Sequence, residues 1–279
     1  MAGRLTREIT EMRITFLGTG AGSSTLRAHT GMALECPDGT KLLLDASSGN
    51  SVLRHANAVG LNLREFDDLL LSHDHPDHMA GIDFVQFDRA LFGGNCDPLR
   101  VHASHEALEG LKRHCLATRL NIWDISGDYG RNLEGREFLH WKPSPSGHVI
   151  ELGPRTTAWH FPADHITGAS GWRVECDGMA VVFSGDTRYS PEVARASEGA
   201  DLLIHEAFCV GDTVLASNAG HCTGGEAGQV AAEAGVASLV LTHLTDAFHA
   251  DPDPLGVEAA QHYTGPITIA QDCQQITLG

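Results

Sequence analysis

The sequence of 279 residues predicts an α/β fold, and three observations support this prediction. Short runs rich in Leu, Ile and Val alternate with helix-like segments along the chain from Arg13 onward. Most of these runs are apolar at successive positions, which is typical of strands buried on both faces of a sheet. No run approaches the roughly 18 apolar residues that a membrane-spanning helix needs.

The expected strands are short apolar or β-branched runs, each bounded by polar residues or glycine. In chain order they cover residues 13–18, 31–36, 41–46, 68–73, 99–104, 156–161, 171–176, 179–186, 201–206, 238–243 and 266–271.

Helices are expected between these strands, among them residues 78–92, 104–117 and 224–234. Residues 104–117 carry apolar side chains on one helical face. The segment 224–234 begins after a capping box formed by Thr223 and Glu226, and Gly235 should end it.

Composition predicts one globular domain over residues 13–279, preceded by a flexible leader over residues 1–12. The chain is 42% hydrophobic and contains no linker, repeat or low-complexity tract. The N-terminal residues lack an apolar signal core, so we expect a cytoplasmic protein without membrane attachment. Seven cysteines are scattered and never form Cys-x-x-Cys. This pattern indicates reduced thiols rather than a disulfide framework, and it disfavours a thiolate metal site.

The net charge is −17, from 36 acidic and 19 basic residues. Such an acidic chain disfavours non-specific binding to phosphate backbones, so nucleic acid is not an expected partner. Bound divalent metal ions could nevertheless create a local cationic site on an acidic protein.

Four expected strands end in residues that bind metals or transfer protons. His73, Asp186, the pair His205–Glu206, and His243 each follow a buried apolar run. Several strands that end in this way on one edge of an α/β sheet would bring these side chains to one site. Ligands usually bind at such an edge.

The most crowded of these ends reads His73-x-His75-x-Asp77-His78. Neutral imidazoles and carboxylates are ligands that suit zinc, manganese or iron. On an extended strand end, His73, His75 and Asp77 would share one face, and His78 would begin the next helix. One metal could then bind the two early histidines and another Asp77 and His78. We expect two divalent metal ions, zinc by preference, with manganese or iron as alternatives.

This His-x-His-x-Asp-His run resembles the signature of the metallo-β-lactamase superfamily. The resemblance implies a four-layer αββα sandwich and extends through "DHITGASGWRV" at 164–174, "SGDT" at 184–187 and "LTH" at 241–243. It implies a first metal on His73, His75 and His165, a second on Asp77, His78 and His243, and Asp186 bound to both. His160 is the alternative to His165, although its run predicts the interior of a strand.

Two further segments, "LIHEAF" at 203–208 and "GHCT" at 220–223, resemble elements of the ribonuclease Z branch. That resemblance places His221 near a scissile phosphate, where it would help with proton transfer. The alternative for His221 is a loop histidine that caps the following helix. His205 and Glu206 would brace the site behind the ligands. Asp45 would orient a ligand histidine, unless it only shapes a turn.

The chain departs from this branch in three ways. Phe208 stands where the first element usually has Thr, and Cys222 where the second has Ser. Ribonuclease Z enzymes also commonly insert a long tRNA-gripping arm between the positions of His165 and Asp186. Here only 20 residues separate those two positions, so pre-tRNA is not the expected substrate.

The prediction is therefore a dinuclear metal-dependent hydrolase, a phosphodiesterase acting on a small-molecule or nucleotide-type ester. A water bridging both metals would lose a proton near neutral pH and attack the ester. Asp77 would hold this nucleophile, and His221 would protonate the leaving group. Alternatives are a ribonuclease Z-type endonuclease, an arylsulfatase, a lactonase or a β-lactam hydrolase. A metal-binding sensor or scaffold without turnover, and a redox role with iron, are competing classes.

Segments 84–100 and 117–150 are candidate walls of the substrate pocket. Their aromatic residues could equally belong to the core or to a homodimer interface; these are Phe84, Phe87, Phe92, Trp123, Tyr129 and Trp141. The glycine-rich run 16–24 fails the register of a dinucleotide loop and predicts a tight turn near the site.

Overall fold

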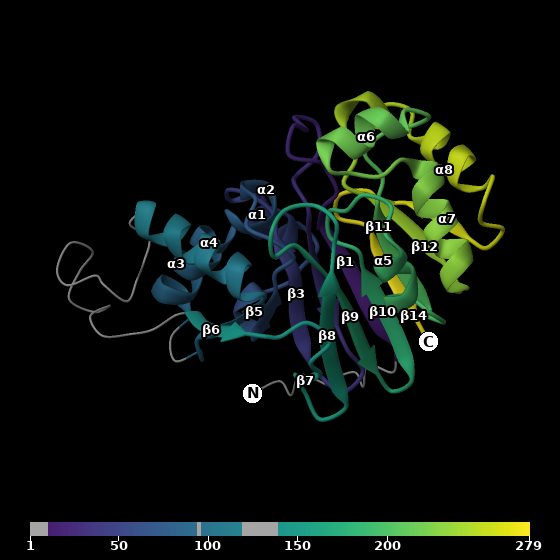
Figure 1. Cartoon of the computed structure of the whole chain (residues 1–279). Helices are drawn as coiled ribbons and strands as arrows, with labels where there is room; N and C mark the ends of the chain where they lie inside the picture. The colour runs from purple at the N-terminus through teal and green to yellow at the C-terminus, as the bar shows by residue number, and fades with distance from the viewer. Residues whose placement is uncertain (1–10, 94–95, 119–138) are drawn as a thin grey trace.

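The computed structural model of the chain describes residues 11–93, 96–118 and 139–279. Most of the expected leader lies outside these residues, as do Trp123 and Tyr129. Two seven-stranded sheets pack face to face, and helices cover the outer face of each (Figure 1). The four-layer αββα sandwich expected from the resemblance is confirmed.

The first sheet has the order β14-β1-β2-β3-β4-β5-β6. Its strands are β14 (Gln275–Leu278), β1 (Met12–Gly18), β2 (Gly31–Glu35), β3 (Lys41–Ala46), β4 (Asp68–Leu70), β5 (Leu99–Ala103) and β6 (Leu139–Pro143). The second has the order β13-β12-β11-β10-β9-β8-β7. Its strands are β13 (Ile267–Ile269), β12 (Leu239–Thr242), β11 (Leu202–Glu206), β10 (Met179–Phe183), β9 (Ser170–Cys176), β8 (Thr156–Pro162) and β7 (Ile150–Glu151).

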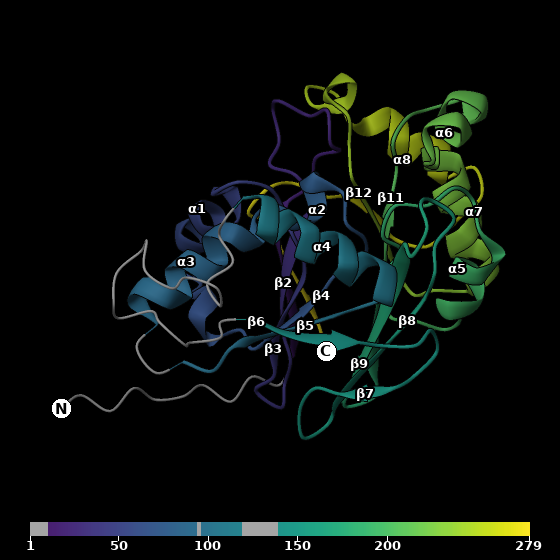
Figure 2. The ribbon, with the colours of Figure 1, turned by 60° about the vertical axis from the view of Figure 1, so that its left-hand side comes forward.

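The helices lie on the two outer faces of the sandwich, as the second view shows (Figure 2). Those beside the first sheet are α1 (Ser51–Ala58), α2 (Pro76–Met79), α3 (Ile82–Phe92) and α4 (His105–Ala117). Those beside the second are α5 (Pro191–Ala196), α6 (Thr213–Ala219), α7 (Gly224–Ala234) and α8 (Asp253–Ala259). Short 3₁₀ turns occur at Leu63–Glu65 and Asp246–Phe248.

Alternating side chains of each strand enter different cores, which explains why the strands are apolar at successive positions. In β3, Leu42 and Leu44 pack between the sheets, whereas Leu43 packs under the first helical layer. In β10, Val182 packs under the second helical layer, between the inward-facing Val181 and Phe183. Successive strand residues point to opposite faces, so a strand in a middle layer must be apolar on both.

The expected helix over 78–92 is wrong in one respect, because the chain forms two helices, α2 and α3, with a break at Ala80–Gly81. Gly81 lies against the end of β3, and its N–H donates to the carbonyl oxygen of Ser47 (3.0 Å). The other two expected helices agree with α4 and α7, including the Thr223–Glu226 capping box and left-handed Gly235.

Several short elements were not expected from the sequence. They are α1, α5, α6, α8 and the strands β6, β7 and β14, some of which lie partly exposed at the ends of the sheets. Among the described residues no helix is long and apolar enough to cross a membrane.

The aromatic residues considered for a pocket wall separate into two groups. Phe84 and Phe92 are exposed on α3, at 38% and 70%. Trp141 packs against the core between the first sheet and its helices, so it serves the core.

Gly81→Ala should destabilise the fold by about 1–3 kcal/mol, because the added methyl group would lie 1.9 Å from the carbonyl oxygen of Ala46. Gly256→Ala in α8 is the matched control. Its methyl group would meet only the Ile269 side chain at 3.4 Å, and alanine favours a helix by up to about 1 kcal/mol. Urea unfolding of both variants, with a chelator present to exclude metal effects, measures the difference. Equal stability of the two variants would contradict this account of the break.

Candidate metal centre

Parallel strands from both sheets bring the expected site residues to one edge of the sandwich. Strands β3 to β6 run parallel in the first sheet, and β10 to β13 do so in the second. His73 follows β4, Asp186 follows β10, Glu206 ends β11 and His243 follows β12. The expected convergence of these strand ends is thus present in the structure.

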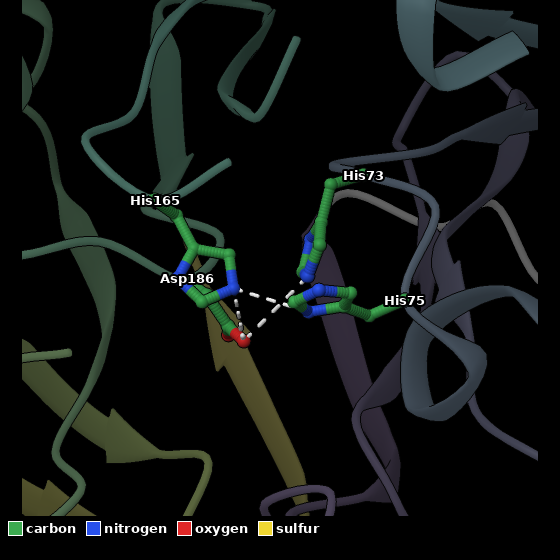
Figure 3. Close-up of side chains that lie close together, drawn as sticks. All are labelled: His73, His75, His165 and Asp186. Carbon is green, nitrogen blue, oxygen red and sulfur yellow. Dashed lines mark hydrogen bonds and ion pairs between the residues drawn. The ribbon is translucent and has the colours of Figure 1, made fainter. Parts of the chain in front are cut away.

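The first group of side chains consists of His73, His75, His165 and Asp186, whose potential ligand atoms all lie within 4.8 Å of one another. Figure 3 shows the four side chains pointing toward one another, with Asp186 and His165 opposite His73 and His75. Asp186 Oδ2 lies 3.7 Å from His73 Nε2 and 3.9 Å from His165 Nε2. His165 Nε2 lies 3.1 Å from His75 Nδ1.

The second group consists of Asp77, His78, Asp186 and His243, again with ligand atoms within 4.8 Å of one another. Asp186 Oδ2 lies 3.2 Å from Nε2 of both His78 and His243. Asp77 Oδ2 lies 3.4 Å from the same two nitrogens. Asp186 is the member that the two groups share.

The local backbone differs from the expected strand end. Strand β4 stops at Leu70, and Asp77 lies in the first turn of α2 rather than on an extended strand. Pro76 is the reason, because proline fixes a backbone angle suited to the first position of a helix. His75 and Asp77 therefore reach different groups although only one residue separates them.

Two buried nitrogens that face these groups have no hydrogen-bond partner in the described part of the chain: His73 Nε2 and His78 Nε2. Burying an unpaired polar atom is costly, so such atoms are uncommon in folded proteins. Imidazole nitrogens beside ionised carboxylates form a donor set that suits divalent metal ions. The residues present therefore fit two metal ions, one in each group.

The pKa shifts agree with this donor chemistry. Burial, together with the neighbouring His78, lowers the pKa of His73, and burial lowers that of His165, which favours neutral imidazoles. Burial alone would raise the pKa of Asp186, but His243 and His78 outweigh it and hold the pKa well below its usual value. Burial would lower the pKa of His78, yet Asp186 and Asp45 raise it, so this position attracts positive charge.

Asp45 orients two of the candidate ligands. Its Oδ2 lies 2.7 Å from His78 Nδ1 and accepts the Ser72 hydroxyl at 2.7 Å. Its Oδ1 accepts the Ser72 N–H, and the Ser72 hydroxyl also contacts His73 Nδ1 at 2.9 Å. With each Nδ1 fixed from behind, the Nε2 atoms of His73 and His78 face the centre.

The structure separates His165 from its alternative, His160. His165 contacts the carbonyl oxygen of Gly220 through Nδ1 (2.8 Å) and faces the first group through Nε2. Both ring nitrogens of His160 are engaged elsewhere, with the Ser144 carbonyl oxygen (2.7 Å) and the Ser170 hydroxyl (3.1 Å). His160 is therefore a buried structural residue of β8.

His221 lies beside the second group and contacts the buried carboxylate of Glu206. Its Nδ1 is 2.9 Å from Glu206 Oε1, and Glu206 also accepts the N–H groups of Thr187 (2.7 Å) and Cys222 (3.2 Å). Burial alone would lower the pKa of His221, but Glu206 outweighs burial and raises the pKa to about 8. Among the described residues, His205 makes a hydrogen-bond contact through Nδ1 with the backbone carbonyl oxygen of Glu206 (2.8 Å), and its Nε2 has no partner.

Three supporting features lacked a usable sequence signal: the Ser72 hydroxyl, the Gly220 carbonyl oxygen and the ring of Phe208. Phe208 stacks on His221, with ring centroids 4.7 Å apart and planes inclined by 10°. The glycine-rich turn does reach the site as expected. A Cβ at Gly22 would lie 2.9 Å from Asp77 Oδ2, so the turn passes directly beside that carboxylate.

Comparison with known proteins agrees with the fold and identifies the family. The family described as Beta-lactamase superfamily domain matches residues 40–244. The chain is similar to the ribonuclease Z of Halorubrum lacusprofundi, at 26% identity over an alignment 303 positions long that covers 94% of this chain and 95% of the relative. Among solved structures it is similar to the metallo-beta-lactamase fold protein YhfI of Bacillus subtilis, with a TM-score of 0.77, 24% identity, and coverage of 96% and 99%. It is also similar to human tRNase Z, short form, with a TM-score of 0.73, 19% identity, and coverage of 96% of this chain and 99% of that structure.

His165→Ala should lower the metal content of the purified protein by about one equivalent, because it removes a nitrogen that points into the first group. His160→Ala should keep the full content, since both nitrogens of that ring are bonded elsewhere. Elemental analysis of the folded fraction of each variant makes the comparison. Loss of metal from His160→Ala with retention in His165→Ala would reverse the assignment.

Proposed function

Because the chain belongs to the β-lactamase superfamily, we propose that it is a hydrolase of phosphodiester bonds that uses two divalent metal ions. The observation that carries this proposal is the pair of four-residue groups that share Asp186. Zinc is the proposed metal because histidine nitrogen and carboxylate oxygen are its common ligands. Manganese and iron bind the same ligand types and are the alternatives.

Metal ions held by these groups would activate water and offset the negative charge of a phosphoryl group. The side chain of Asp77 is 14% exposed and lies beside both His78 and His243, so it can hold an attacking water by a hydrogen bond. The side chain of His221 is 12% exposed. Its Nδ1 is occupied by Glu206, which leaves Nε2 to donate a proton to the leaving group.

A small-molecule or nucleotide-type ester is the proposed substrate. The segment between His165 and Asp186 forms the hairpin of β9 and β10, closed by Asp177 and Gly178, and it contains no long arm. The alignment with the Halorubrum relative is 303 residues long, more than this chain contains, so that relative carries positions that are missing here. Because this hairpin carries no arm, the proposal assigns recognition to groups close to the scissile bond.

Cleavage of precursor tRNA is the second candidate, and the relatives named ribonuclease Z are the observation that favours it. The net charge of −17 and the short hairpin support the small-ester proposal instead. A cytoplasmic location is part of the proposal, and the seven free cysteines of the structure support it.

Zinc- or manganese-loaded protein should hydrolyse bis(p-nitrophenyl) phosphate, a small phosphodiester. Asp186→Ala should reduce turnover by roughly a thousandfold or more, because the charge stabilisation supplied by the metals is worth several kcal/mol. Asp251→Ala, an exposed residue, is the matched control and should retain activity.

Either of two results would count against the proposal. The first is full activity in an Asp186→Ala protein whose metal content has been measured. The second is an inactive metal-loaded wild type, which would favour carboxylic ester, lactone, β-lactam or sulfate substrates. Faster cleavage of precursor tRNA than of any small ester would favour the second candidate.

His221→Ala should affect substrates according to their leaving groups. A dinucleotide leaves as a sugar alkoxide that needs a proton, so its hydrolysis should slow by roughly 100- to 10,000-fold. Nitrophenolate needs little protonation, so bis(p-nitrophenyl) phosphate should lose less than about tenfold. The exposed His262→Ala serves as the control in parallel steady-state assays. Equal losses on both substrates would exclude a proton-donor role for His221.

A further inference from the structure

A third group of potential ligands lies at the other end of the sandwich. Cys36 directly follows β2 of the first sheet, and Cys176 ends β9 of the second. Both are buried, at 0% and 1% exposure, in the core between the sheets. The two sulfur atoms and a carboxylate oxygen of Asp38 all lie within 4.8 Å of one another.

This group is remote from the catalytic candidates. Glu35, just before Cys36, pairs with Lys41 at the start of β3, whereas Asp45 lies near the end of that strand. Cys176 pairs with Met179 at the start of β10, and Asp186 follows the end of β10. The two centres therefore lie at opposite ends of the same strands.

Asp38 is held as an ionised carboxylate beside the thiols. Its Oδ1 accepts the N–H of Thr40 (2.9 Å) and its Oδ2 the N–H of Arg155 (2.8 Å). These bonds outweigh burial and lower the pKa of Asp38. The Arg155 guanidinium is bound to Asp177 instead (2.9 Å), so it does not neutralise Asp38 through a direct ion pair.

Thr156 borders the group from the next strand. It is fully buried, and its hydroxyl lies within reach of the Cys36 thiol and the Asp38 carboxylate. Thr156 pairs with Cys176 across β8 and β9, so this hydroxyl borders the same group.

We propose that Cys36, Cys176 and Asp38 form a structural site for a thiophilic divalent cation, zinc in the first instance, that links the two sheets. Two sulfur ligands and one carboxylate are a donor set that zinc accepts. Structural zinc usually has four ligands, and the fourth position would lie on the side of Thr156. Binding would displace the thiol protons to solvent, and no oxidant is required.

Cadmium NMR of wild-type protein, stripped of metal, reduced and reloaded with the NMR-active cadmium isotope, tests this site directly. Sulfur-bound cadmium resonates far from cadmium bound only by nitrogen and oxygen, and the catalytic candidates contain no sulfur. We expect one sulfur-type signal in addition to the signals of the His and Asp groups. This readout does not depend on activity, so failure of the proposed function would leave it intact.

Variants identify the ligands. Cys36→Ser and Cys176→Ser should each abolish the sulfur-type signal, and Asp38→Asn should weaken cadmium binding there by about tenfold or more. Cys115→Ser is the matched control, because Cys115 is equally buried but lies on α4, in the core between the first sheet and its helices. The sulfur-type cadmium signal of the Cys115→Ser variant should be unchanged.

Two outcomes would overturn the proposal. The first is a reloaded wild type without any sulfur-type signal, which would leave the cysteines as core packing. The second is a count of five thiols instead of seven after denaturation of the purified protein without reductant, restored to seven by reductant. That result would show a disulfide between the sheets in place of a metal site.

Discussion

Burial of the Asp186 carboxylate is the constraint on which the rest of the candidate centre depends. The residue is 2% exposed, and its Oδ2 lies within 4.0 Å of nitrogens from His73, His78, His165, His221 and His243. An isolated buried carboxylate costs several kcal/mol or more unless positive charge compensates it. The crowding of histidines and acids after β4 is therefore explained only together with Asp186 and His243, which complete the centre. Divalent cations would balance the acids and use the imidazole lone pairs together.

Two residues of the candidate centre have a strained backbone, and contacts within the sandwich keep them in this conformation. Asp45 and His243 have left-handed φ values of 54° and 58°, which are unfavourable for residues with a Cβ. Such strain costs about 1–3 kcal/mol and persists only where the surroundings impose it. Asp45 is fixed by Ser72 and His78, and next to His243 the N–H of Leu244 is bonded to the carbonyl oxygen of Thr19. Both strained residues position groups of the centre, so the strain is tied to the site.

Local pattern and strand order account for what the sequence could predict. Continuous apolar runs indicated middle-layer strands, and their polar ends indicated the converging edge, because both features are local. The break at Gly81 was missed because it depends on contact with Ala46, 35 positions away in the chain. The contact of His165 with the Gly220 carbonyl oxygen depends on how a loop meets the end of α6. The spacing of Cys36 and Cys176 in the chain does not indicate their proximity, because that proximity arises from the packing of two sheets.

The departures from the ribonuclease Z pattern affect recognition more than chemistry. Phe208 replaces the usual Thr, yet Glu206 still contacts His221, which is stacked between Phe208 and His243 at centroid distances of 4.7 and 5.0 Å. Contacts on both ring faces and at Nδ1 fix the imidazole, so the orientation of the ring does not need that Thr. The missing arm has no such replacement in the short β9–β10 hairpin. Binding energy from remote parts of a large substrate is then unavailable to lower the barrier. The groups gathered around Asp186, together with a β9–β10 hairpin that offers no distant grip, therefore support the proposal of a substrate small enough to lie beside the proposed metal ions.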